Sequence, residues 1–171
     1  MAIEVPTGEP TAAAVGWGPA AEHLTLRFLG EVPAERVPDI SSALASAAGA
    51  SSAFRLVLEG VGAFPDARRP RVVWVGATEG RREAIELAER VAESLAPITG
   101  ERPREPFVPH LTLFRVRSPA ERRRAEELLA GRMPPPPPRT VSVREICLKE
   151  SVLDPGGARH RTLAAWPLAP A

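Results

Sequence analysis

The stretch HLTLRFLG occupies residues 23–30, and its first four letters return at residues 110–113 within FVPHLTLFRV. The chain has three histidines, so two of them stand at the head of the same tetrapeptide. Both stretches alternate apolar and polar residues and are rich in strand formers, which predicts two strands with one face in the core. Their recurrence, each before a predicted helix, indicates two related halves that each contribute one equivalent strand.

Side chains on a regular strand point alternately to its two faces. His23 and Thr25 therefore share one face, with Arg27 next along it, and His110 and Thr112 share a face in the second copy. The opposite faces carry apolar residues, which we expect in the core: Leu24, Leu26 and Phe28 in the first copy, Leu111 and Leu113 in the second. Each strand thus offers an imidazole and a hydroxyl on its polar face.

The composition is that of a globular protein, because 44% of the 171 residues are hydrophobic and 25% are charged. The length suits one domain, or one domain built from two similar lobes, with a sizeable core. A net charge of +1 gives no bulk attraction to polyanions. Any contact with a nucleic acid should therefore be local and short.

The single cysteine, Cys147, excludes an internal disulfide framework and favours a reducing compartment, so we expect a cytoplasmic protein. It lies in the alternating run VREICLKE, where a buried thiol is the better interpretation. No segment is apolar enough to span a membrane, and the N-terminal residues lack the features of a secretory signal. We expect no membrane partner and no obligatory protein partner.

Turn residues and hydrophobic periodicity predict three helices and a larger number of strands. The expected helices cover residues 33–48, 79–96 and 119–130, and the expected strands cover 2–5, 23–29, 54–64, 71–77, 107–116, 140–153 and 160–168. In the third helix Ser118 stands at the capping position and Glu121 can close a capping box. Adjacent strands with interspersed helices favour an α+β fold with antiparallel sheets.

If the two histidine faces meet across a cleft, two imidazoles and two hydroxyls line it. Imidazole works as an acid or a base near neutral pH, so one ring can accept a proton while the other donates one. Hydroxyls and a nearby guanidinium can hold a phosphate oxyanion without a metal. This set of groups is suited to attack on a phosphodiester.

The histidines also allow other interpretations. A lone histidine on a solvated sheet face needs no functional explanation, although the repetition argues against that interpretation here. Zinc would need a third ligand, for which His160 is available, but neither histidine face carries an Asp, Glu or Cys. The chain also lacks a nucleophile elbow and a glycine-rich phosphate loop. We therefore expect neither a metal nor another cofactor.

At these residues the sequence resembles the two-histidine (2H) phosphoesterase superfamily, which is defined by a pair of His-x-Thr-x motifs. Within it, the chain is most similar to the RNA 2',3'-cyclic phosphodiesterase family, also called 2'-5' RNA ligase-like. The likeness extends over nearly the whole chain. It comprises the segments HLTLRFLGEV, VGAFP before PRVVWVG, FVPHLTLFR and KESVLDPGGARHRTL, in the order of that family.

The resemblance implies a single bilobal domain over residues 1–171, with two antiparallel sheets facing a central groove and helices on the outside. It also implies metal-independent hydrolysis of a 2',3'-cyclic phosphate, on an RNA end or a small nucleotide, to the 2'-phosphate. A non-catalytic or weakly catalytic RNA-end binding module and 2'-5' RNA end joining in the same site are the alternatives.

By position in the motifs, His23 would be the proton donor and His110 the proton acceptor, while Thr25, Thr112 and Arg115 would bind the phosphate. On a regular strand Arg115 would point away from His110, so reaching the phosphate requires a bend at the strand end. Phe107 and Arg27 are candidates for nucleotide contact, although packing and solvation explain them equally well.

Two features depart from the family pattern. The helix usual between the first strand and the first motif does not fit in residues 6–20, which carry glycines and prolines. The first lobe is therefore expected to be shortened near the N-terminus. The last segment carries His160 where an aromatic residue is common.

Overall fold

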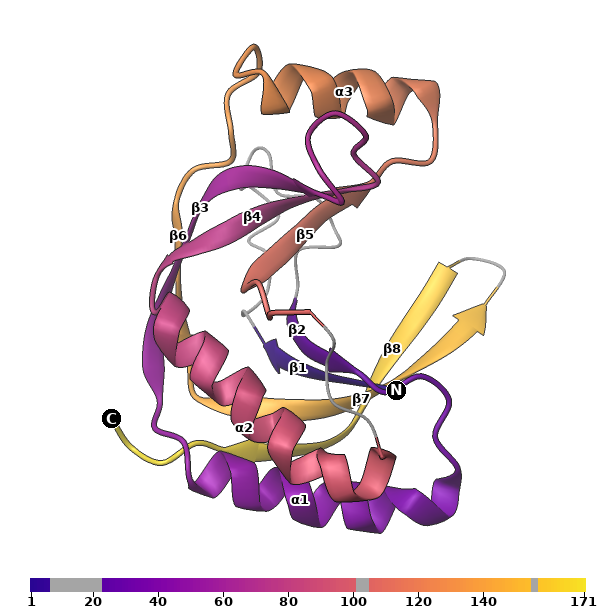
Figure 1. Cartoon of the computed structure of the whole chain (residues 1–171), viewed down its shortest axis with the longest axis vertical. Helices are drawn as coiled ribbons and strands as arrows, with labels where there is room; N and C mark the ends of the chain where they lie inside the picture. Colours follow the sequence, from indigo (N-terminus) through magenta and orange to yellow (C-terminus); the bar gives the residue numbers. More distant parts are fainter. Residues whose placement is uncertain (7–22, 101–104, 155–156) are drawn as a thin grey trace.

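The computed structural model describes residues 1–6, 23–100, 105–154 and 157–171. Within these ranges the chain forms two four-stranded antiparallel sheets and three α-helices (Figure 1). The predicted α+β class with antiparallel sheets is therefore confirmed. The expected shortening of the first lobe falls mainly on residues 7–22, which lie outside the described residues.

The first sheet has the strand order β2-β1-β7-β8. Its strands are β1 (Ala2–Pro6), β2 (His23–Phe28), β7 (Glu145–Asp154) and β8 (Gly157–Pro167). The second sheet has the order β5-β4-β3-β6, built from β3 (Phe54–Phe64), β4 (Val72–Glu79), β5 (His110–Arg115) and β6 (Arg139–Val143). Each HLTL segment thus forms an edge strand, one in each sheet.

The single strand expected over residues 140–153 is wrong, because the chain changes sheet at Arg144. β6 pairs with β3, whereas β7 pairs with β1 and β8. The continuous core contains Val141 and Val143 before Arg144, then Ile146 and Leu148 after it. Cys147, between the last two, is buried as well. The alternation therefore shifts by one residue at Arg144, and a strand that changes its buried face in this way serves two different sheets.

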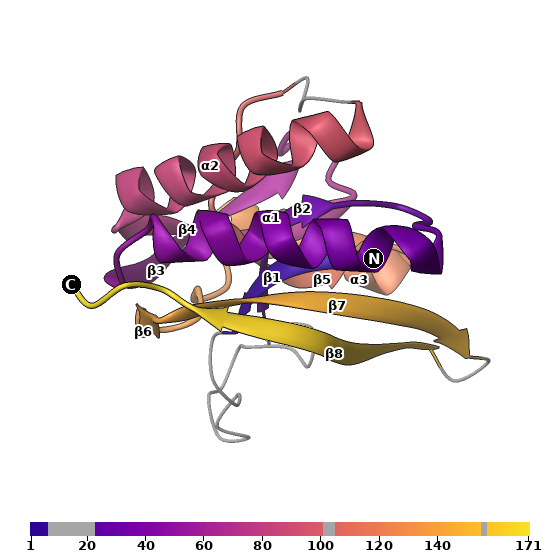
Figure 2. The ribbon, with the colours of Figure 1, turned by 90° about the horizontal axis from the view of Figure 1, so that it is seen from below.

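The three helices pack against the two sheets. α1 (Val37–Gly49) contacts β7, β8 and α2 (Arg81–Thr99), and α2 also contacts β2, β3 and β4. Figure 2 shows α1 and α2 on one side of the long β7–β8 ribbon. α3 (Pro119–Leu129) contacts β3. Leucines, valines and alanines from both sheets and all three helices form one continuous core.

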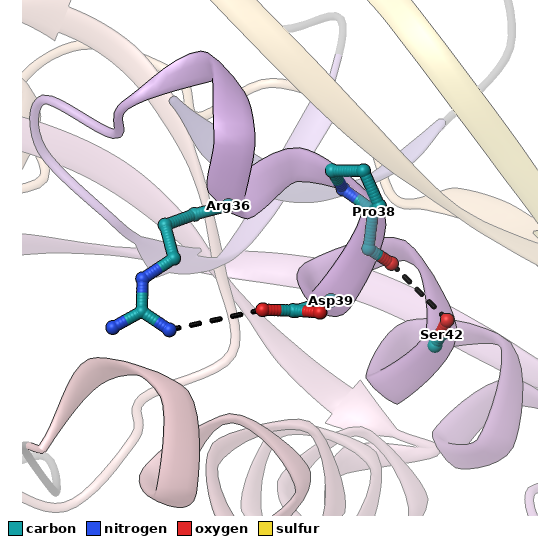
Figure 3. A network of polar contacts seen from close by, with 4 residues as sticks. All are labelled: Arg36, Pro38, Asp39 and Ser42. Carbon is teal, nitrogen blue, oxygen red and sulfur yellow. Dashed lines mark hydrogen bonds and ion pairs between the residues drawn. The ribbon is translucent and has the colours of Figure 1, made fainter.

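α1 and α3 begin differently. A 3₁₀ turn (Ala34–Arg36) leads into α1, where an Arg36–Asp39 ion pair of 3.7 Å and the Ser42 hydroxyl on the Pro38 carbonyl (3.1 Å) lie at the start (Figure 3). No side chain caps α1.

α3 has the predicted cap, because the Ser118 hydroxyl accepts the Glu121 backbone N–H at 3.2 Å. The Glu121 carboxylate in turn accepts the Arg117 backbone N–H at 2.7 Å, one residue earlier than the usual capping box places it. This bond, together with one from the Ser118 hydroxyl, holds the pKa of Glu121 below its ordinary value.

Candidate active site

The two HLTL segments lie next to each other because the edge strands β2 and β5 are in contact (Figure 1). The histidine and threonine of each motif are half-buried, whereas the intervening Leu24 and Leu111 are 1% and 0% exposed. This is the alternation that the sequence predicts for the first four residues of each strand. The fold thus brings His23, Thr25, His110 and Thr112 onto adjacent edges of the two sheets.

A β-bulge in β5 decides where Arg115 points. Residues 73 and 74 of β4 are neighbours, but their partners on β5 are Phe114 and Thr112, so Leu113 is an extra residue. Paired residues of neighbouring strands share a face, and the bulge restores Arg115 to the face of His110. The bend that the sequence required for Arg115 is this bulge.

β2 carries the same irregularity at the equivalent place. Residues 3 and 4 of β1 pair with Arg27 and Thr25, so Leu26 is the extra residue. Phe28, not Arg27, therefore follows Thr25 on the face of His23. The predicted positions of these two side chains are wrong beyond the bulge, and the expectation that Phe28 is buried is wrong as well, since it is 71% exposed.

An open groove of about 1240 Å³ borders the two motifs. Thr25 and His110 line it, together with Phe28, residues of α2 and the segment 105–108 that leads into β5. Phe107, a candidate for nucleotide contact, belongs to this lining and also packs against the core. His23, Thr112 and Arg115 share the faces of these residues on β2 and β5 but do not line the groove itself.

A backbone hydrogen bond defines the tautomer of His110. Its Nδ1 lies 2.7 Å from the Val108 carbonyl oxygen. A carbonyl oxygen only accepts hydrogen bonds, so Nδ1 carries the hydrogen. In the neutral ring Nε2 then bears the lone pair and is the atom that can accept a proton.

Two aromatic side chains hold the His110 ring from β3 and β4. The edge of one ring meets the face of the other between Phe64 and His110, with centroids 4.9 Å apart, and Trp74 lies 5.9 Å away. Gly62 and Gly76 leave room for the Trp74 indole, since an added Cβ at Gly62 would overlap it.

Phe64 and Trp74 were not among the residues predicted for the site. The sequence signal for them is a large aromatic residue close to glycines on neighbouring strands, since a glycine in a strand often marks a close approach.

The environment lowers the pKa of His110 below its ordinary value of 6.5. Burial is the largest cause, because it disfavours the charged ring. The positive charge of Arg115 acts in the same direction, and the bond to Val108 opposes both. His110 is therefore neutral at neutral pH. The influence of Arg115 also agrees with its position on the His110 face.

The described residues offer no metal site and no membrane-spanning helix. No three His, Cys, Asp or Glu side chains among them gather closely enough to hold a metal ion. The side chain of His160 lies outside the description. Cys147 is 4% exposed, which confirms the predicted buried thiol. None of the helices, as far as they are described, is long and apolar enough to cross a membrane.

Two antiparallel sheets, each with a His-x-Thr strand at its edge, are the arrangement expected from the resemblance to two-histidine phosphoesterases. The profile of the 2'-5' RNA ligase superfamily matches residues 18–154. The chain belongs to this superfamily, and the resemblance to two-histidine phosphoesterases is confirmed.

Curated relatives of the chain are named RNA 2',3'-cyclic phosphodiesterases. An RNA 2',3'-cyclic phosphodiesterase of Aeropyrum pernix is 37% identical over 141 residues, covering 82% of this chain and 78% of the relative. One from Archaeoglobus fulgidus is 36% identical over 84% of this chain and 78% of its own length. The chain is an enzyme of the kind that these relatives represent.

Solved structures extend the likeness to the whole chain. E. coli LigT in its apo form superposes with a TM-score of 0.72 and 29% identity, covering 98% of this chain and 96% of LigT. A LigT complex with 3'-AMP gives a TM-score of 0.71 at 28% identity, with the same coverage. The fold is therefore that of LigT.

Proposed function

We propose that this chain hydrolyses the 2',3'-cyclic phosphate of RNA ends or small nucleotides to the 2'-phosphate. The observation that carries the proposal is the state of His110. Its Nδ1–H is committed to the Val108 carbonyl, and burial keeps its pKa low. A neutral imidazole with Nε2 available, next to a second His-x-Thr strand, is suited to general-base catalysis. The relatives named RNA 2',3'-cyclic phosphodiesterase support this substrate class.

The reaction divides the proton transfers between the two histidines. His110 Nε2 removes a proton from a water molecule, whose oxygen attacks the phosphorus. The bond from phosphorus to the 3'-oxygen breaks, and His23 in its protonated form donates a proton to that oxygen. The phosphate remains on the 2'-oxygen. Proton exchange with solvent then restores a neutral His110 and a protonated His23.

Thr25, Thr112 and Arg115 stabilise the phosphate in this proposal. The two hydroxyls donate hydrogen bonds to non-bridging oxygens, and the guanidinium offsets the charge that develops on them. The shared face of His110, Thr112 and Arg115 in the β4–β5 register supports the three assignments on β5. Thr25 is supported by its place in the groove that His110 also lines.

The proposed reaction is independent of metal ions, because imidazole groups supply the proton transfers, and hydroxyl and guanidinium groups supply the charge stabilisation.

We also propose that the domain consists of two pseudo-symmetric lobes, which the equivalent bulges in β2 and β5 support. The buried single Cys147 supports work in the reducing cytoplasm.

The test uses 2',3'-cyclic AMP and an RNA oligonucleotide that ends in a 2',3'-cyclic phosphate, both in excess EDTA. We expect the 2'-phosphate as the product, with activity unchanged by the chelator. Loss of activity in EDTA with recovery on adding a divalent ion would contradict metal independence. Tight binding of the oligonucleotide without any product would instead identify an RNA-end binding module.

A further inference from the structure

Positive charge is concentrated in two segments of the chain, residues 65–71 and 115–124. Together they hold eight arginines and two carboxylates, a net charge of +6, whereas the whole chain has a net charge of +1. The rest of the chain therefore carries a net charge of −5. A segregation of this size creates a local positive field although the bulk charge is close to zero.

The fold brings the two segments to the same end of the second sheet (Figure 1). Residues 65–71, which we call the arginine loop, connect β3 to β4, and residues 115–124 contain the end of β5 and the first half of α3. β4 pairs with β5 as far as Arg115, and the Val116 N–H donates to the Arg71 carbonyl at 2.9 Å. Two segments that are distant in the sequence thus form one basic surface.

Hydrogen bonds hold the backbone of the arginine loop and leave its guanidinium groups available. The Asp66 carboxylate accepts the backbone N–H groups of Arg68 at 2.8 Å and Arg69 at 3.0 Å. The Arg71 N–H donates to the carbonyl of Phe64, whose ring packs against His110. All three arginines are exposed, and the ion pairs among the described residues involve other arginines. A fixed backbone with unpaired cations is suited to an anionic ligand.

The groove that His110 lines has the opposite charge on its α2 side. Its wall carries three carboxylates, Glu89, Glu93 and Glu105, and Arg27 is the basic residue among its described lining. Carboxylates repel a phosphate and guanidinium groups attract it. A phosphate-bearing chain is therefore disfavoured on the α2 side and favoured at the end of β5, where the basic surface begins.

We propose that the arginine loop binds the phosphates of the RNA strand that precedes the cyclic phosphate. A 2',3'-cyclic phosphate closes the last ribose of a strand, so the rest of the RNA continues only from the 5'-oxygen of that ribose. Arg115 lies about 15 Å along β5 from His110, and the arginine loop adjoins it. The strand leaves the site past Arg115 towards this loop. The inference rests on the proposed function, because it gives the path of that substrate.

The first experiment compares 2',3'-cyclic AMP with an RNA pentamer that ends in adenosine 2',3'-cyclic phosphate. Both present the same terminal nucleotide, so the ratio of kcat/KM for the pentamer to kcat/KM for cyclic AMP measures binding of the preceding strand. In Arg68→Gln/Arg69→Gln we expect this ratio to fall about tenfold, mainly through KM for the pentamer. Each lost phosphate contact should also lower the slope of log KM against log salt concentration by about 0.7.

Arg81→Gln/Arg144→Gln is the matched control. It removes two exposed arginines outside the basic surface, one at the start of α2 and one between β6 and β7. Both double variants have the same net charge, so a general electrostatic effect would appear in both. The ratio and the salt slope should keep their wild-type values in the control. Circular dichroism of the two variants checks that they are folded.

A binding measurement separates this inference from the proposed function. Fluorescence anisotropy gives the Kd of a labelled pentamer that ends in a 2'-phosphate, whether or not turnover occurs. If the wild type hydrolyses neither substrate, yet Arg68→Gln/Arg69→Gln weakens this binding about tenfold and the control does not, the role of the arginine loop stands and the proposed function fails. If the wild type is active and the folded Arg68→Gln/Arg69→Gln variant keeps the wild-type ratio and Kd, the role of the arginine loop is overturned.

Discussion

β2 and β5 start with the same four residues and end by presenting different chemistry. Both strands bury their leucines, half-bury their His-x-Thr pair and then carry one extra residue, Leu26 or Leu113. After the bulge β2 turns Phe28 towards the site and β5 turns Arg115. The comparison teaches that the bulge shapes the site, because the order Arg-Phe or Phe-Arg after HLTL decides which side chain shares the face of the motif histidine.

The largest expected effect comes from replacing the two motif histidines, because the proposal gives His23 the role of proton donor and His110 the role of proton acceptor. His23→Ala and His110→Ala should each reduce kcat by about 100- to 10,000-fold on a 2',3'-cyclic nucleotide. A substrate with sulfur in place of the 3'-oxygen needs no proton on its leaving group, because a thiolate departs readily. We expect this substrate to restore much of the activity of His23→Ala but none of that of His110→Ala. Equal recovery in both variants would contradict the assignment of acid and base.

Arg115 provides a second, smaller test, at the point where the strands diverge. Arg115→Gln should reduce kcat/KM by about tenfold, the loss of roughly one charge-assisted hydrogen bond to phosphate. Arg115 also lowers the pKa of His110, so its removal should raise that pKa. His110 acts as a base only when neutral, and activity is lost as the pH falls through its pKa.

The acid limb of the pH–rate profile should therefore move to higher pH in Arg115→Gln, from a wild-type position below 6.5. Arg117→Gln, which removes a guanidinium two residues further along the chain, is the control and should keep the wild-type profile. An acid limb that stays in place in Arg115→Gln would show that the guanidinium does not act on His110.

The smallest expected effect comes from the aromatic support of His110. Gly62→Ala places a Cβ against the Trp74 ring, and overpacking of this kind costs about 1–3 kcal/mol of unfolding free energy. Displacing Trp74 also admits water to His110, which should raise its pKa and move the acid limb to higher pH. Urea denaturation and the pH–rate profile measure the two effects.

Gly49→Ala, where no atom lies within 4 Å of the added Cβ, is the control for stability. It should change the unfolding free energy by less than about 1 kcal/mol. If Gly62→Ala were equally mild in both measurements, Trp74 would have no part in setting the state of His110.

Several local features could be predicted from the sequence because neighbouring residues determine them. The Ser118 cap of α3 depends on residues within one turn, and it forms as predicted. Cys147 is buried as predicted, but so are its neighbours Ile146 and Leu148, so alternation along the strand is not the reason. In the first four residues of each HLTL strand, buried and half-buried side chains alternate as predicted. The strand face on which His23 and His110 lie could therefore be predicted without the tertiary structure.

The features that were missed depend on partner strands. Residues 140–153 read as one strand, although the shift of the buried face at Arg144 separates β6 from β7. The contact of Phe64 and Trp74 with His110 joins the consecutive strands β3 and β4 to β5, which follows them only after α2. α2 supplies Glu89 and Glu93 to the groove only because it packs beside β2.

The sequence by itself determined the two strands, their buried leucines and the pairing of an imidazole with a hydroxyl on each. These follow from the period of two, which is a property of any extended chain. Only the tertiary structure decided that Phe28 and Arg115 return to the faces of His23 and His110 and that Arg27 does not. A bulge forms when one strand matches its extra residue against a partner, so its position depends on strand pairing that local sequence does not specify.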